Sequence, residues 1–155
     1  MHLHLAQINV ARLSYGPADR RSAGFMRNLD RINALAEQSP GFVWRLKDDS
    51  GNAIVIQGHV DPNVIINMSV WQTAEAFEQF VWQTAHRKFY ANRRKWFDVA
   101  VQPHLAMWWI TPGDVPRLAD GIARLEALRR DGPSDRGFGW ESLPDVQMWK
   151  AARCA

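Results

Sequence analysis

The chain has 155 residues, a length typical of one globular domain, with 46% hydrophobic and 23% charged residues. These values exclude a disordered chain, a collagen-like repeat and a coiled coil. The formal net charge of +3 is too small to indicate nucleic-acid binding by itself. No apolar run approaches the ~20 residues of a membrane span, and the single cysteine, Cys154, cannot form an internal disulfide. We therefore expect a cytoplasmic protein that binds neither membrane nor nucleic acid.

The N-terminal segments predict a strand followed by a helix. Residues 3–13 alternate between apolar and other positions, and Gln7 and Asn9 fall on the same face of the expected strand. Apolar residues then recur at helical spacing over 20–38, with Asp19 as a plausible N-cap. A Ser-Pro-Gly sequence ends this helix.

Three strands are expected next. Two of them, 42–47 and 53–57, are joined by residues 48–52, which have the composition of a hairpin turn. The third covers 64–71 and alternates along its length.

The following segment, 74–97, is predicted to be helical, with Thr73 as its N-cap. It carries two apolar stripes on opposite faces, and a straight helix would expose one of them. We therefore expect a kink or two helices near residues 82–86.

A strand over 103–110 is predicted to precede a third helix, with Asp114 as its N-cap and Gly132 at its end. The apolar stripe of this helix consists of Leu118, Ile122, Leu125 and Leu128. Residues after 132 are rich in Gly, Pro and Ser and show no clear period. We expect one domain over 1–132 and a tail, 133–155, that packs on the domain or on a partner.

The order of these elements predicts an α+β fold: a ferredoxin-like βαββαβ sandwich, with helices on one face of an antiparallel sheet and an added C-terminal helix. The strands at 42–46 and 105–110 have apolar residues at both odd and even positions, and so on both faces of the strand. This indicates that both faces of the sheet are buried. Because few helices remain to cover the second face, we expect a second copy of the chain to cover it. The predicted state is a homodimer.

The stretch 64–87 carries a resemblance to a known group of proteins. Its features are a strand ending in Trp71, the helical pair Ala76-Phe77, and then Ala85-His86. It resembles the dimeric α/β-barrel superfamily, and more narrowly the antibiotic-biosynthesis monooxygenases and the small haem-degrading monooxygenases. The whole chain is most similar to an uncharacterised bacterial domain family of that superfamily. The resemblance implies a dimeric barrel and an oxygenase-like activity.

Haem-degrading members use an Asn on the first strand, a Trp at the end of a later strand and an axial His on the helix. Asn9, Trp71 and His86 occupy the matching positions. The resemblance thus implies a cofactor-independent monooxygenase for a hydrophobic or aromatic molecule, with His86 as base, Asn9 as the partner of an anion or of oxygen, and Trp71 as pocket wall. The allied alternative is a haem protein with His86 as axial ligand. The chain departs from the family by its greater length, its third helix and its Trp-containing tail.

Further pocket residues follow from shared faces. Asn67 and Ser69 share the strand face of Trp71, while Trp82 and Phe89 share a helical line with His86. Packing alone also accounts for such residues, so a non-catalytic dimer that binds a ligand stays open. A basic cluster over 87–95 could hold a carboxylate or the haem propionates, or could be a solvated helix face. No metal site is predicted, and the motifs of flavin and nicotinamide binding are absent from the sequence.

Overall fold

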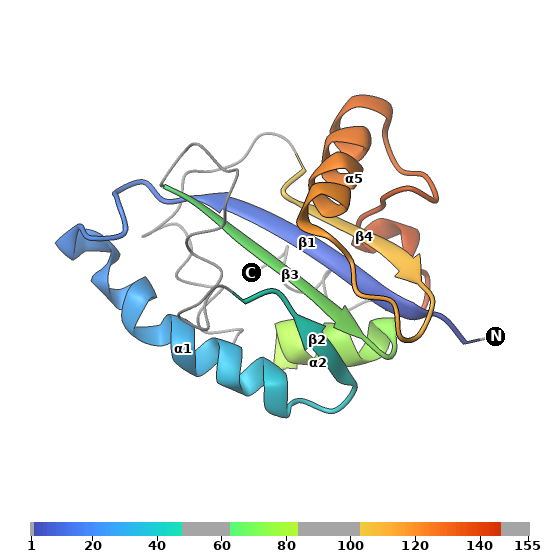
Figure 1. The fold of residues 1–155 in the computed structure, drawn as a ribbon, viewed down its shortest axis with the longest axis horizontal. Coiled ribbons are helices and arrows are strands. Elements are labelled where there is room, and N and C mark those ends of the chain that lie inside the picture. The colour runs from blue at the N-terminus through green and yellow to red at the C-terminus, as the bar shows by residue number, and fades with distance from the viewer. Residues whose placement is uncertain (1, 48–62, 84–102, 147–155) are drawn as a thin grey trace.

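The computed structural model describes residues 2–47, 63–83 and 103–146. The described elements are β1 (His4–Arg12), η1 (Arg20–Ser22), α1 (Ala23–Gln38), β2 (Phe42–Arg45), β3 (Val64–Trp71), α2 (Ala74–Gln83), β4 (Leu105–Ile110), α5 (Leu118–Asp131) and η2 (Trp140–Ser142). The strands form one antiparallel sheet in the order β2-β3-β1-β4 (Figure 1). This topology confirms the predicted α+β, ferredoxin-like fold. None of the helices within the described ranges combines the length and the hydrophobicity of a membrane span.

One face of the sheet packs against α1 and α2. Leu5, Trp71 and Met107 lie on this face and form a buried cluster with α2 residues such as Phe77 and Phe80. At the opposite end of β1, a smaller cluster joins the sheet to the beginning of α1. Polar residues occupy the strand positions between these two apolar clusters.

The second face of the sheet is covered in part by α5, which lies over the β4 end of the sheet in Figure 1. Leu125 and Leu128 of α5 are buried there with Ile8 and Met68. Gly121 makes the close approach possible, since a Cβ at this position would lie 2.8 Å from the Met68 sulfur. The sequence predicted this added helix without assigning it to a face. The structure places it over part of the second face, and the homodimer stays a prediction.

Several predicted boundaries are confirmed and one is wrong. The Thr73 hydroxyl accepts a hydrogen bond from the Ala76 amide at 3.0 Å, as expected of an N-cap, and α5 ends at Gly132, which has φ = 80°. Asp114 is not the cap of α5, because the helix begins only at Leu118, with Arg117 as its N-cap residue. The predicted strand 53–57 and the second part of the predicted helix 74–97 lie outside the described residues.

The described part of the C-terminal segment, 133–146, packs on the domain. Phe138 exchanges two backbone hydrogen bonds with Met107 of β4. Leu143 and Val146 are buried in the same cluster as Trp71. These contacts extend the core beyond β4 and cover the edge of that strand near Met107.

Candidate functional site

A row of polar side chains lies on the sheet face that α1 and α2 cover. The register pairs Gln7 with Ser69 and Asn9 with Asn67 across β1 and β3, and Leu5 with Trp71 one step further along the face. Alternation along each strand directs these side chains to one face. A polar set within an otherwise apolar layer must satisfy its own hydrogen bonds.

These side chains form a continuous hydrogen-bond network. The Gln7 Nε2 group donates to Asn67 Oδ1 at 2.7 Å and to Ser69 Oγ at 2.8 Å. The Asn9 Nδ2 group donates to Gln7 Oε1 at 3.0 Å and lies 3.5 Å from Asn67 Oδ1. At the other end, the Trp71 indole N–H donates to Ser69 Oγ at 2.9 Å. Gln7 therefore connects the buried end of the network to the two asparagines.

Burial changes along the network. Gln7 and Ser69 are 1% and 5% exposed, whereas Asn9 and Asn67 are half-buried. The two asparagines thus form the solvent-accessible end. Their amides could hold an oxygen atom of a ligand, since neutral amides are common orienting groups in binding sites.

Trp71 closes the other end and is fully buried. Its ring stacks on Phe80 with centroids 5.2 Å apart, and it also contacts Phe77 and meets Phe42 edge-on. The predicted role of Trp71 as a pocket wall stays a prediction. In the described residues, this side chain joins the core to the polar network.

The remaining predicted site residues are only partly described. Trp82 is 7% exposed and packs near Trp140, with ring centroids 6.1 Å apart. His86, Phe89 and the basic cluster at 87–95 lie outside the described residues. The structure therefore brings together Asn9, Asn67, Ser69 and Trp71 from the predicted set. It adds Gln7. The sequence indicates only that Gln7 lies on the same strand face as Asn9, two residues away.

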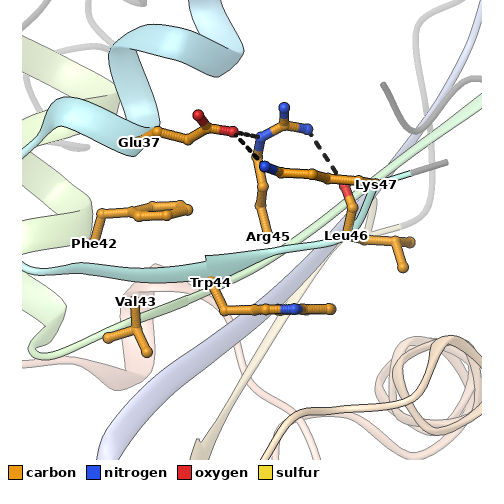
Figure 2. A pocket seen from close by; sticks show the side chains of 7 residues that line it. All are labelled: Glu37, Phe42, Val43, Trp44, Arg45, Leu46 and Lys47. Carbon is orange, nitrogen blue, oxygen red and sulfur yellow. Dashed lines mark hydrogen bonds and ion pairs between the residues drawn. The ribbon is translucent and has the colours of Figure 1, made fainter. Parts of the chain in front are cut away.

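A separate hollow of about 550 Å³ lies at β2 (Figure 2). Glu37 accepts a hydrogen bond from Arg45 Nε at 2.7 Å and pairs with Lys47 Nζ at 3.1 Å. These cations, Arg45 first, hold the pKa of the Glu37 carboxyl below its usual range. Val43 and Trp44 lie on the opposite side of the strand. One carboxylate here faces two cations, so this hollow carries a net positive charge and is a weaker candidate for binding a neutral aromatic molecule.

A second hollow of about 400 Å³ lies where β4 meets α5. The guanidinium of Arg124 stands over the Trp108 ring at 5.1 Å and also donates to the Arg136 carbonyl oxygen at 2.8 Å. Trp109, 43% exposed, forms part of its lining. Arg124 is thus engaged in holding the C-terminal segment against the domain.

The expected haem ligand, His86, lies outside the described residues. Within them, Trp71 is enclosed by aromatic rings and the Asn9 amide N–H group is bonded to Gln7. Within the described ranges, no group of three or more His, Cys, Asp or Glu side chains could hold a metal. What the described geometry offers is a set of neutral hydrogen-bonding groups.

Comparison with known proteins agrees with the fold. A family model described as "Domain of unknown function (DUF3291)" matches residues 4–154. The cofactor-independent oxygenase SnoaB from Streptomyces nogalater is 16% identical with a TM-score of 0.50, covering 74% of this chain and 99% of its own. A Nitrosomonas europaea protein of unknown function is 12% identical with a TM-score of 0.52, covering 75% and 97%. Among the curated proteins, none matches. At these identities the two structures support the ferredoxin-like fold.

Proposed function

This chain belongs to the family described as domain of unknown function DUF3291, and from that premise we propose that it is a small homodimeric monooxygenase. Its substrate would be a hydrophobic, aromatic molecule, oxidised without a bound cofactor. The observation that carries the proposal is the polar network, whose accessible end presents Asn9 and Asn67 while its other end lies in an aromatic core. The fold shared with a cofactor-independent oxygenase supports it.

In this proposal the substrate supplies the electrons for the reaction with dioxygen. A base removes the proton of a phenol, and the resulting anion reacts with oxygen. The amide group of Asn67 would stabilise the phenolate oxygen by donating a hydrogen bond, and Asn9 would orient the substrate beside it. For 1-naphthol, one oxygen atom enters the ring to give the quinone, and the other leaves as water.

We assign the base to His86 as part of the proposal. Helix α2 begins just after β3 and turns back along it (Figure 1). The ten residues of α2 extend ~15 Å, and the run from Trp71 back to Asn67 extends ~13 Å along β3. Gln83 at the end of α2 would thus be level with Asn67, and His86 follows three residues later in the sequence. Trp82 and Phe89 would complete the apolar surroundings of the substrate.

Oxygen uptake tests the proposal. The purified protein is mixed with 1-naphthol or 1,5-dihydroxynaphthalene in an oxygen-electrode cell, and the quinone is identified by mass spectrometry. We expect uptake that falls at least ~100-fold in His86→Ala and ~10-fold in Asn67→Ala. Ser134→Ala is the control and should retain full activity. Saturable binding of these phenols without oxygen uptake would contradict the proposed monooxygenase activity and favour a non-catalytic ligand-binding dimer.

The homodimer has its own support and its own test. On the second sheet face α5 leaves apolar side chains near β2 accessible, with Val43 40% exposed and Trp44 and Leu46 only partly buried. A second copy would cover them. Sedimentation equilibrium should report twice the 17.8 kDa chain mass, and Trp44→Glu should shift the protein toward the monomer. A wild type that is monomeric at all concentrations would contradict the dimer.

A further inference from the structure

The network leaves two amide atoms directed away from Gln7, and their chemical types differ. Asn67 uses its oxygen to accept from Gln7, so its Nδ2 group faces outward as a donor. Asn9 uses its nitrogen to donate to Gln7, so its Oδ1 atom faces outward as an acceptor. Within the described residues, neither outward atom has a hydrogen-bond partner. Both side chains are half-buried, so solvent reaches them.

We infer that Gln7 is a positioning residue that holds the Asn9 and Asn67 amides as an acceptor beside a donor. The site would then take the edge of a planar molecule that carries a hydrogen-bond donor next to a carbonyl oxygen, such as a lactam or a hydroxyl beside a ketone. This inference rests on the proposed function in taking this sheet face as the substrate site.

The geometry around Gln7 carries the argument. Its side chain is 1% exposed and makes hydrogen bonds to three other side chains, Asn9, Asn67 and Ser69. A primary amide has one acceptor end and one donor end. Because the two ends of Gln7 engage different asparagines, those asparagines must present opposite ends to the outside.

Such a pair distinguishes ligands by the order of their polar groups. A cis-lactam presents N–H and C=O side by side, so its N–H can donate to Asn9 Oδ1 while its C=O accepts from Asn67 Nδ2. A ligand without the N–H leaves the Asn9 oxygen without a partner. A site that is built to bond a donor rejects the analogue that lacks it.

A matched pair of probes tests this order by isothermal titration calorimetry. The probes are 2-quinolone and coumarin, which share a planar bicyclic frame with a carbonyl and differ in a ring N–H against a ring oxygen. For the wild type we expect 2-quinolone to bind about two- to tenfold more tightly, the value of one neutral hydrogen bond. Equal affinities, or no binding of either probe at millimolar concentration, would overturn the inference.

Two matched variants test the direction of the pair, since each replaces an amide by a carboxylate. Asn67→Asp exchanges the outward donor for an acceptor facing the lactam carbonyl, and it should weaken 2-quinolone binding at least about tenfold. Asn9→Asp removes the Nδ2 donor to Gln7 Oε1 and places an oxygen against it, so the Asn9 acceptor should lose its fixed orientation and the affinity ratio of the two probes should fall toward one. Unchanged binding of 2-quinolone in Asn67→Asp, or an unchanged affinity ratio in Asn9→Asp, would show that the amides are arranged otherwise.

Gln7→Met tests the positioning role. Methionine has a similar length without the amide, so the asparagines should lose their fixed orientation. The ratio of the affinities for the two probes should then fall toward one. A variant that keeps the wild-type preference would contradict the role of Gln7. This readout is a ratio, so a general loss of stability does not imitate it.

A measurement on the wild type does not depend on any variant folding. Side-chain amide protons of Gln7 and Asn9 should exchange slowly with solvent in ¹H–¹⁵N spectra, while those of Asn67 should exchange fast. Protected Asn67 protons would overturn the inference. These binding and exchange results are independent of turnover. If the protein takes up no oxygen but still prefers 2-quinolone, the proposed activity is contradicted and the inferred binding site stands.

Discussion

Replacing Ser69 by alanine is the sharpest stability test of the buried end of the network. The Ser69 hydroxyl oxygen accepts from the Trp71 indole N–H at 2.9 Å and from Gln7 Nε2 at 2.8 Å. Both donors belong to side chains that are at most 1% exposed, so water cannot easily replace the lost acceptor. Each buried donor without a partner costs about 1–3 kcal/mol.

The expected loss in the free energy of unfolding for Ser69→Ala is therefore about 2–4 kcal/mol. The lower part of the summed range applies because Gln7 Nε2 keeps its bond to Asn67 Oδ1. Ser134→Ala is the matched control: Ser134 is exposed and accepts one hydrogen bond, from the Arg136 amide at 3.2 Å. It should cost less than about 0.5 kcal/mol.

Urea unfolding followed by tryptophan fluorescence measures both variants. A double-mutant cycle with Trp71→Phe then isolates the indole–hydroxyl bond, for which we expect a coupling free energy of about 1 kcal/mol or more. If Ser69→Ala costs no more than Ser134→Ala, the donors are not buried as described and the reasoning from the network is wrong.

Three further predictions concern other parts of the molecule. Arg45 lowers the pKa of Glu37 in the folded state, so the Glu37 carboxylate adds stability above its unfolded pKa, and this stability is lost as pH falls through the folded pKa. Glu37→Gln should therefore flatten the acid side of the curve of unfolding free energy against pH. Gly121→Val should lower the free energy of unfolding, measured in urea, by about 2 kcal/mol, because the larger side chain overpacks against the sheet. The control is Ala119→Val at an exposed position of the same helix, which should lower it by less than ~0.7 kcal/mol. Added hemin should show no Soret shift that depends on His86, and a shift abolished by His86→Ala would contradict this.

The order of elements was predictable because strand and helix periods differ clearly in this chain. Polar residues recur at every second position in both strands, at Gln7 and Asn9 of β1 and at Asn67 and Ser69 of β3. The apolar stripe of α5 reaches the buried cluster at Leu125 and Leu128. Helix α5 begins at Leu118, later than the sequence predicts from Asp114 as N-cap. Pro116 disfavours helical backbone at the residue before it, and the helix begins only after the extended Arg117, with ψ = 149°.

Two features needed the structure itself. A helical stripe shows which side of α5 is buried, but not which face of the sheet it covers, and this decides how much of the second face is left for a partner. Likewise the sequence shows that Gln7 and Asn9 share one face of their strand. Their partners on β3, however, depend on the register between two strands that are separated by more than fifty residues. The central role of Gln7 could not be predicted without that register.

The most direct test of the central claim is a titration of the ¹⁵N-labelled protein with 1-naphthol, followed through side-chain amide and guanidinium signals. We expect the Asn67 and Asn9 amides to shift most and to saturate together, while the Arg45 and Arg124 guanidinium signals at the two other hollows stay in place. Shifts that are confined to either hollow, with unchanged asparagine amides, would show that the phenol does not bind at the polar network.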